Sequence, residues 1–583
     1  MTVSILVLAL LTAALGDGGA QESTVLASYD LRAVLPRWDD GTSWSQSLNH
    51  LPGVGPEQET SEAGGNYSDM AAFEVLDLLT QVMGDELRRE GREMLVDGSA
   101  LTVLAPEPVQ EQVRAVLDAL RQALAGTIAV RVDVLALGDG SSVDLVPSSV
   151  LADDEAAKLV ASLIGRGAQQ RSFQLELSAG RTAWVDARRR VPFVFDYDVE
   201  IAQGSVVFAP FVPELRDGVR MGLRGLPVNG GLALSSVLMI NDLLGKISER
   251  KLLLRGQLNR IPPNQAEVVS SELVKGPGAV QMPQTLVRAL AFDTFVPDGK
   301  ALVLSLETDL GPARTREVVI LRRLGGSMTS YVARPIPRTN RTLIALNVEL
   351  FRTPSLVSSL VTEHDDYDHP QAQVVANFDA EAPSFLVEWV KVRFSVWRRF
   401  GPWILIVTDP AWDREAASDL ERLIQSRRGN VRLVQAGVDL RAQGRETPFP
   451  VRARLPVVAG TSVGLVVGRA FTYLGAYQVE VAQGASVPDP VMQCMFEGLA
   501  MTWAVDPTTC EAAGIAQLLD APPATFDPAY DLMGPLDRPE PRVLSFDERL
   551  NLPEGPTARA RIGMASDRPE QQGLTVELSV GSR

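Results

Sequence analysis

The densest group of residues that could do chemistry is a short acidic segment with two histidines. His364 and His369 alternate with carboxylates and one tyrosine in the sequence Glu-His-Asp-Asp-Tyr-Asp-His. Imidazole and carboxylate groups together can bind a divalent metal ion. The five-residue spacing matches no catalytic arrangement, and the remaining histidine, His50, lies far away in the chain. We therefore interpret the segment as a hydrophilic linker and predict no metal site, with metal binding kept as the alternative.

A serine in a G-x-S-x-G pattern is the second chemical candidate. Ser462 lies between Gly460 and Gly464, but a nucleophile elbow needs a helix after the serine. Here Leu465-Val-Val467 follows, which predicts a strand and a hairpin turn instead. No histidine lies downstream to act as the base, and no P-loop, dinucleotide or H-E-x-x-H motif is present. We therefore predict no catalytic residues and no cofactor.

Two cysteines, Cys494 and Cys510, are the only thiols in the chain. In an oxidising compartment they could form one disulfide, which would stabilise its loop by about 3 kcal/mol. The alternative is two buried reduced thiols.

The beginning of the chain and its overall charge indicate export. Residues 1–20 contain an apolar run from Val3 to Leu15 and small residues before Gln21, which is typical of a signal peptide. No later segment is long and apolar enough to cross a membrane as a helix. The formal net charge of -17 at pH 7 argues against binding nucleic acid. We expect an exported protein that is soluble or assembled through β-strands.

Residues 24–138 predict a small α+β domain. Apolar residues recur at helical spacing in 69–83 and again in 106–124, and residues 127–137 alternate as a strand does. Two short strands turn at Asp97-Gly98. The expected order is strand, helix, strand, strand, helix, strand, so that the helices cover one face of a small sheet.

One stretch of this domain resembles the periplasmic N-domains of bacterial secretins. In that family a strand of the type G-x-L-x-V-x-A leads into a helix with regularly spaced Val and Leu. The matching residues here are Gly98, Leu101, Val103, Ala105, Val109, Val113, Val116, Leu117 and Leu120. The following region is similar in order to the family's β-rich part, at Gly180–Ala183, Val191–Phe193 and Gly204–Pro210. The resemblance implies a ring-forming oligomer at the outer membrane.

The chain also contains an internal repeat. Tyr197–Gly204 (YDVEIAQG) recurs as Tyr477–Gly484 (YQVEVAQG), and downstream matches keep the same offset. Upstream the offset shifts, and we align Arg188 and Arg190 with Arg452 and Arg454, Glu155-Ala-Ala157 with Glu415-Ala-Ala417, and Val130–Val132 with Val392–Phe394. A repeated β-rich block indicates duplicated architecture rather than an active site.

These patterns predict an α+β chain with a small βαββαβ N-domain followed by two related β-rich modules. The expected divisions are a signal peptide at 1–20, the N-domain at 24–138, a first β-rich module at 139–355, a linker at 356–379, a second β-rich module at 380–510, and a Pro- and Asp-rich tail with one final strand at 511–583.

The favoured function is a non-enzymatic, secretin-like envelope protein, periplasmic or associated with the outer membrane. It would act in secretion or transport by assembly with itself or with partner subunits. The alternative is a soluble periplasmic or extracellular binding or structural module with no pore role. A third hypothesis is a hydrolase that uses carboxylates alone.

Overall fold

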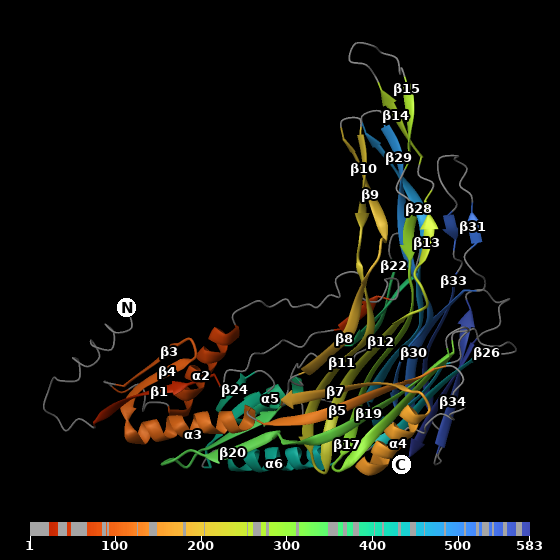
Figure 1. Cartoon of the computed structure of the whole chain (residues 1–583). Helices are drawn as coiled ribbons and strands as arrows, with labels where there is room; N and C mark the ends of the chain where they lie inside the picture. Colours follow the sequence, from red (N-terminus) through yellow and green to blue (C-terminus); the bar gives the residue numbers. More distant parts are fainter. Residues whose placement is uncertain are drawn as a thin grey trace.

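The structure is a computed structural model dominated by β-strands, and all of its strand pairings are antiparallel in the part described (Figure 1). It describes residues 23–32, 44–47, 67–83, 89, 92–124, 126–138, 149–178, 182–202, 205–252, 255–260, 270–275, 279–309, 314–347, 359–364, 370–376, 384–400, 403–410, 413–429, 433–442, 451–459, 461–482, 485–505, 509–519, 524–526, 536–538, 541–551, 557–566 and 574–582.

The first α+β unit has a three-stranded sheet with two helices on one face. Its sheet order is β1-β4-β3, and Gly98 makes the β3–β4 turn at φ 56°, in the left-handed region that glycine enters without strain. The elements are β1 (Thr24–Asp30), α2 (Tyr67–Met83), β3 (Glu93–Asp97), β4 (Ala100–Pro106) and α3 (Glu107–Leu124). The strands and helices predicted in this region are present. The expected last strand, β5 (Thr127–Leu137), differs because it pairs in the large sheet described below.

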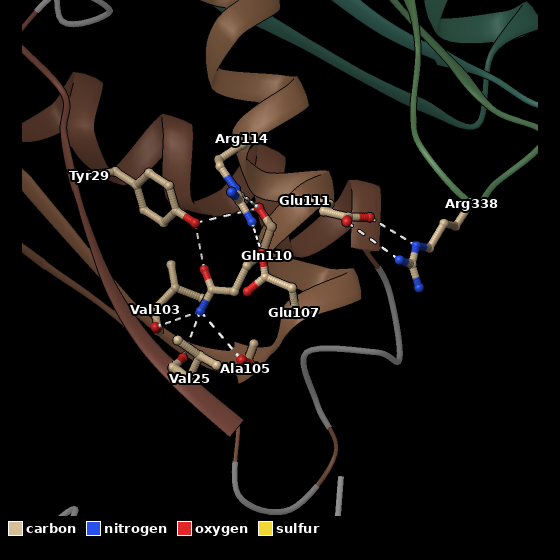
Figure 2. Close-up of polar contacts among 9 residues, drawn as sticks. All are labelled: Val25, Tyr29, Val103, Ala105, Glu107, Gln110, Glu111, Arg114 and Arg338. Carbon is tan, nitrogen blue, oxygen red and sulfur yellow. Dashed lines mark hydrogen bonds and ion pairs between the residues drawn. The ribbon is translucent and has the colours of Figure 1, made fainter. Parts of the chain in front are cut away.

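A buried glutamine joins α3 to the first sheet (Figure 2). The Gln110 side-chain amide donates to the carbonyl oxygens of Val25 and Val103 at 2.8 and 2.9 Å, and its oxygen accepts from the Tyr29 hydroxyl at 2.6 Å. These partners satisfy a polar group that would be costly to bury alone. Gln110 therefore sets the position of α3 along β1 and β4.

A second α+β unit repeats the order and the pairing of the first. The strand β21 pairs with β25, which pairs with β24, as β1 pairs with β4 and β4 with β3. An additional strand, β20, extends the second sheet at β21. The elements are β20 (Tyr331–Pro335), β21 (Thr342–Asn347), α5 (Ser384–Arg393), β24 (Val396–Phe400), β25 (Trp403–Thr408) and α6 (Arg414–Gly429).

The helices of the first unit lie between the two small sheets. One core joins α2, α3 and the β4 residues Leu101 and Val103 to Leu343, Trp403 and Leu405 of the second sheet. The other face of the second sheet packs on α5 and α6. The second sheet is therefore covered on both faces, once by its own helices and once by those of the first unit.

Most of the remaining strands form two walls that pack face to face. The first wall runs β8-β11-β12-β17-β28-β29-β30-β33-β34. The bounds of these strands are β8 (Thr182–Pro192), β11 (Glu214–Val228), β12 (Gly231–Leu243), β17 (Gln284–Pro297), β28 (Thr461–Ala482), β29 (Ala485–Val505), β30 (Thr509–Leu519), β33 (Pro541–Asn551) and β34 (Thr557–Ser566).

The second wall runs β35-β26-β27-β18-β19-β5-β7, and β34 and β7–β8 connect it to the first wall, so that the sheet closes on itself. Alternate residues of β5, such as Ile128 and Val130, point into the shared apolar core, while Leu135 packs on α4 outside it. The elements are β35 (Leu574–Ser582), β26 (Leu433–Ala442), β27 (Val451–Val458), β18 (Lys300–Asp309), β19 (Arg314–Ser327), β7 (Gln169–Ser178), β6 (Ser149–Ala152) and α4 (Asp153–Gly165).

A charged cluster interrupts the core between the walls. The Arg288 guanidinium of β17 contacts the carboxylates of Asp242 on β12 and Glu317 on β19, and donates to the Thr315 hydroxyl at 2.8 Å. Arg288 and Glu317 are almost completely buried. Burial raises the pKa of the Glu317 carboxyl above its ordinary value, although the neighbouring Arg288 opposes this shift.

Two predicted divisions of the chain are wrong. The segment 511–583 is not mainly a tail, because β30, β33, β34 and β35 are strands of the walls. The predicted final strand is present as β35, which pairs with β26. The predicted linker 356–379 contains β22 (Ser359–His364) and β23 (Pro370–Ala376), which form a small sheet with β2 (Trp44–Ser47).

Candidate assembly surface

The repeated sequence block forms two hairpins with the same register. In the first, β9 (Asp196–Ala202) and β10 (Ser205–Phe211) pair so that Tyr197 faces Pro210. In the second, which is the outer part of β28 and β29, Tyr477 faces Pro490. The turn glycines Gly204 and Gly484 lie outside the described residues. The repeat predicted from the sequence therefore corresponds to one hairpin geometry used twice.

Register also corrects the upstream part of the predicted repeat. Gly218 pairs with Arg188, and its counterpart Gly498 pairs with Gly468. Arg188 therefore corresponds to Gly468, and not to Arg452, which lies on β27 in the opposite wall.

The helical match is wrong for the same reason. Glu155 lies in α4, which follows β5, whereas Glu415 lies in α6, which precedes β26. Residues 130–132 are a strand and 392–393 end the helix α5, so that match is wrong as well.

The two hairpins project from the walls and meet each other, with β9 lying against β28 and β29 (Figure 1). Tyr197 and Phe208 of the first hairpin pack on Leu474, Met492 and Tyr477 of the second in one apolar cluster. Three short ribbons lie alongside: β13 (Ser248–Lys251) with β16 (Ala279–Met282), β14 (Arg255–Arg260) with β15 (Ser270–Lys275), and β31 (Ala524–Phe526) with β32 (Leu536–Arg538).

A half-buried carboxylate ties the hairpins together. Asp196 accepts hydrogen bonds from the main-chain N–H groups of Met492 at 3.2 Å and Tyr197 at 2.8 Å. The Tyr197 hydroxyl in turn donates to the carbonyl oxygen of Ala279 at 3.2 Å. Burial raises the pKa of the Asp196 carboxyl above its ordinary value. The nearby Asp198 adds to this shift, and the two N–H donors oppose it.

We expect Asp196→Asn to remove a pH dependence of stability. Because the folded state raises the pKa of Asp196, the folded protein holds this proton more tightly than the unfolded chain does. The contribution of Asp196 to the free energy of unfolding should be full below pH 3.8 and be lost as pH rises through the raised pKa. Urea unfolding of wild type and variant across this range measures the difference, with Glu200→Gln, an exposed change on the same strand, as control. A constant difference between wild type and Asp196→Asn would contradict the assignment.

The outer strand of the first hairpin presents an open, apolar edge. In the part of the chain that is described, β10 pairs with β9 alone. Val207 and Phe211 are 53% and 56% exposed, and the Phe211 ring makes an edge contact with Phe195, with the ring centroids 6.2 Å apart. On the same face, β9 places Glu200 opposite Val207 and Asp198 opposite Ala209. An edge strand with unpaired main-chain groups and exposed apolar residues is a template for pairing with another chain.

The chemical candidates from the sequence do not come together at this surface. His364 ends β22, and His50 and His369 lie outside the described residues. Within the described ranges no group of three His, Cys, Asp or Glu residues could hold a metal ion. Ser462 is the second residue of β28, so a strand continues after it as predicted. The predicted hairpin is wrong, because β27 and β28 belong to opposite walls and the connection between them joins the walls.

The strand register does not fit a bridge between Cys494 and Cys510. Cys510 faces Val505, and Cys494 lies eleven residues earlier on β29. At about 3.3 Å per residue the two positions are roughly 36 Å apart along the strand. A disulfide needs Cα atoms within about 7 Å. The register therefore does not support the possible disulfide between these two cysteines within one chain.

Sequence reasoning missed the two features that define this surface. The open edge of β10 depends on which strands pair, and the role of Asp196 depends on a partner almost 300 residues away. The one available signal was a difference between the repeats, since Asp196 precedes the repeated tyrosine in the first copy and Ala476 does so in the second.

Comparison with known proteins gives weak similarities to secretins. No protein family profile matches the chain and no curated protein does. Among solved structures, the type II secretion system secretin GspD of E. coli K12 is 10% identical, with 55% of this chain and 67% of that chain covered and a TM-score of 0.24. The V. cholerae type IV competence pilus secretin PilQ is 9% identical, with 55% and 81% covered and a TM-score of 0.18.

GspD of enteropathogenic Escherichia coli is 11% identical, with 48% of this chain and 87% of that chain covered and a TM-score of 0.21. These values are too low to carry a functional argument, which rests on the residues of this chain. None of the helices in the described ranges combines the length and apolar composition that a bilayer crossing requires.

Proposed function

We propose that this chain is a non-enzymatic exported envelope protein of secretin-like type that acts by assembly. It would associate with further copies of itself or with partner subunits, in outer-membrane secretion or transport. The observation that carries the proposal is the open β10 edge, where main-chain groups and the exposed Val207 and Phe211 lie together. Strand addition at such an edge gives affinity through main-chain hydrogen bonds and specificity through alternate side chains.

Two further observations support a role in assembly rather than in catalysis. The residues from Gly98 to Leu120 that resemble secretin N-domains form a strand and a helix, β4 and α3, as that resemblance implies. The duplicated hairpin also points to a structural role, because the same strand register is used twice.

The decisive measurement is the mass of the purified mature chain with and without detergent, together with cell fractionation. Val207→Lys with Phe211→Lys should raise the dissociation constant of the multimer at least tenfold, because lysines on an edge strand oppose pairing. The measured mass should fall accordingly. Leu324→Lys, a similarly exposed apolar position on β19, is the matched control and should leave the mass unchanged. A monomer under all conditions would favour the soluble binding module instead. Multimers that are indifferent to the β10 substitutions would remove the edge from the proposal.

A further inference from the structure

The two α+β units provide an internal template for a contact between chains. The turn between β3 and β4 corresponds to the turn between β24 and β25, so Ala100 corresponds to Trp403 and Val103 to Ile406. This alignment is consistent with the packing, because Val103 and Ile406 both face the helices of their own unit. The opposite faces of the two sheets are therefore equivalent as well.

In the second unit, that opposite face holds the helices of the first unit. Trp403 and Leu405 supply its apolar centre. Polar contacts at its margin come from four arginines of the second unit. Arg398 on β24 contacts Asp77 of α2 at 2.6 Å. The others are Arg338 to Glu111 at 2.9 Å, Arg334 to Gln122 at 2.9 Å and Arg341 to the Val82 carbonyl at 3.1 Å, of which the Arg338 contact is drawn in Figure 2.

In the first unit, the equivalent surface faces outward. We call it the first-sheet outer face, and the strand register places its residues in three rows across β1, β4 and β3. Leu26 and Leu95 are 47% and 51% exposed, so part of its apolar surface meets solvent. The rows are Leu26–Leu104–Glu93, Ser28–Thr102–Leu95 and Asp30–Ala100–Asp97.

The strand β3 carries acidic residues on this face, whereas the equivalent strand β24 carries a basic one between two apolar residues, Val396 and Phe400. Leu95 takes the place of Arg398, and Glu93 and Asp97 flank it on β3. In the template, Arg398 receives an acidic residue of α2. A helix that docks here should therefore present an apolar residue flanked by cations.

The helix α5, which corresponds to α2, has such a site in its last turn. Val392 is 82% exposed, the highest value among the exposed large apolar residues in the described chain. Lys391 and Arg393 flank it. Their ion pairs with Glu388 at 3.6 Å and Asp419 at 2.9 Å are surface pairs of low energy, and Arg393 also lies over the Trp389 ring, 5.2 Å from its centroid.

We infer that the last turn of α5 in one copy docks on the first-sheet outer face of a second copy. Val392 would pack on Leu95, with Lys391 and Arg393 beside Glu93 and Asp97. The inference rests on the proposed function, since it specifies a surface for that assembly. The contact joins two different surfaces, so it is head-to-tail and extends from copy to copy until it closes into a ring or continues as a filament.

Cysteine crosslinking tests the contact directly. In a chain with Cys494→Ala and Cys510→Ala, one preparation carries Leu95→Cys and another carries Val392→Cys. Oxidation of the mixture should give a covalent dimer, whereas each preparation alone should not, because a head-to-tail contact brings position 95 to position 392. Phe73→Cys, an exposed position on α2, mixed with Val392→Cys is the control and should give no dimer.

Charge reversal provides a second, independent measurement. Glu93→Lys with Asp97→Lys should weaken association at least tenfold, and adding Lys391→Glu with Arg393→Glu should restore it. Multimers that form without 95–392 crosslinks and ignore the charge reversals would overturn this inference and leave the proposed function intact. A chain that is monomeric by light scattering, with its β10 edge intact, would overturn both.

Discussion

Arg288→Ala is expected to lower the free energy of unfolding by about 3–5 kcal/mol. The substitution removes the only cation described in contact with Glu317, which is 1% exposed between the two walls. An unpaired buried carboxylate must either remain charged in an apolar core or bind a proton, and both alternatives disfavour the folded state. Denaturant unfolding monitored by circular dichroism measures the loss.

The control for this prediction is an ion pair of the same type at the surface. Lys158 and Asp154 lie 3.3 Å apart on α4 with side chains 78% and 69% exposed, so Lys158→Ala should cost about 0.5 kcal/mol or less. Replacing both buried partners, Arg288→Leu with Glu317→Leu, should recover most of the stability lost in Arg288→Ala. A loss in Arg288→Ala as small as that of the surface control would show that the walls open enough to hydrate Glu317.

Trp403→Ala should also lower the free energy of unfolding by about 3–5 kcal/mol. Trp403 is 1% exposed and lies in the core that joins the first unit's helices to the second sheet. Its removal leaves a cavity at this contact, so the first unit should also become more sensitive to limited proteolysis. Denaturant unfolding and protease digestion measure the two effects.

Trp403→Phe separates volume from polarity at the same position. In the described part of the chain the Trp403 indole N–H has no hydrogen-bond acceptor, and an unsatisfied buried donor costs about 1–3 kcal/mol. Phenylalanine removes the donor and keeps much of the volume, so its cost should stay below about 1.5 kcal/mol. Equal losses for alanine and phenylalanine would contradict a cavity as the cause.

Local patterns predicted the elements, because periodicity records which face of an element is buried. The helix α3 begins and ends within a residue of the expected range, β5 has the expected bounds, and the turn at Gly98 is present. These features depend on neighbours in the sequence. The same reasoning found the repeated hairpin, since a tight turn fixes the register of both its strands.

Partners distant in the sequence could not be predicted in this way. The alternation in β5 indicates two faces, but it does not say that β19 and β7 are the neighbouring strands. The duplication of the α+β units was missed because equivalent positions have different surroundings. Thr102 lies on an open sheet face, whereas its counterpart Leu405 is buried under α2 and α3. Matching positions that are buried in one unit and open in the other carry different residues, so the shared topology leaves no signal in the sequence.

Joining the two α+β units in one chain makes their mutual contact independent of protein concentration. Two separate proteins would lose translational freedom at about 4–15 kcal/mol each time such a contact formed. Within one chain the partner is always present, at an effective concentration set by the connecting segment. Dilution can therefore dissociate one chain from another, but it cannot dissociate α2 and α3 from the second sheet that contains Trp403. Any assembly of whole chains also contains an even number of α+β units. The covalent structure therefore excludes a ring with an odd number of these units, whatever the number of chains.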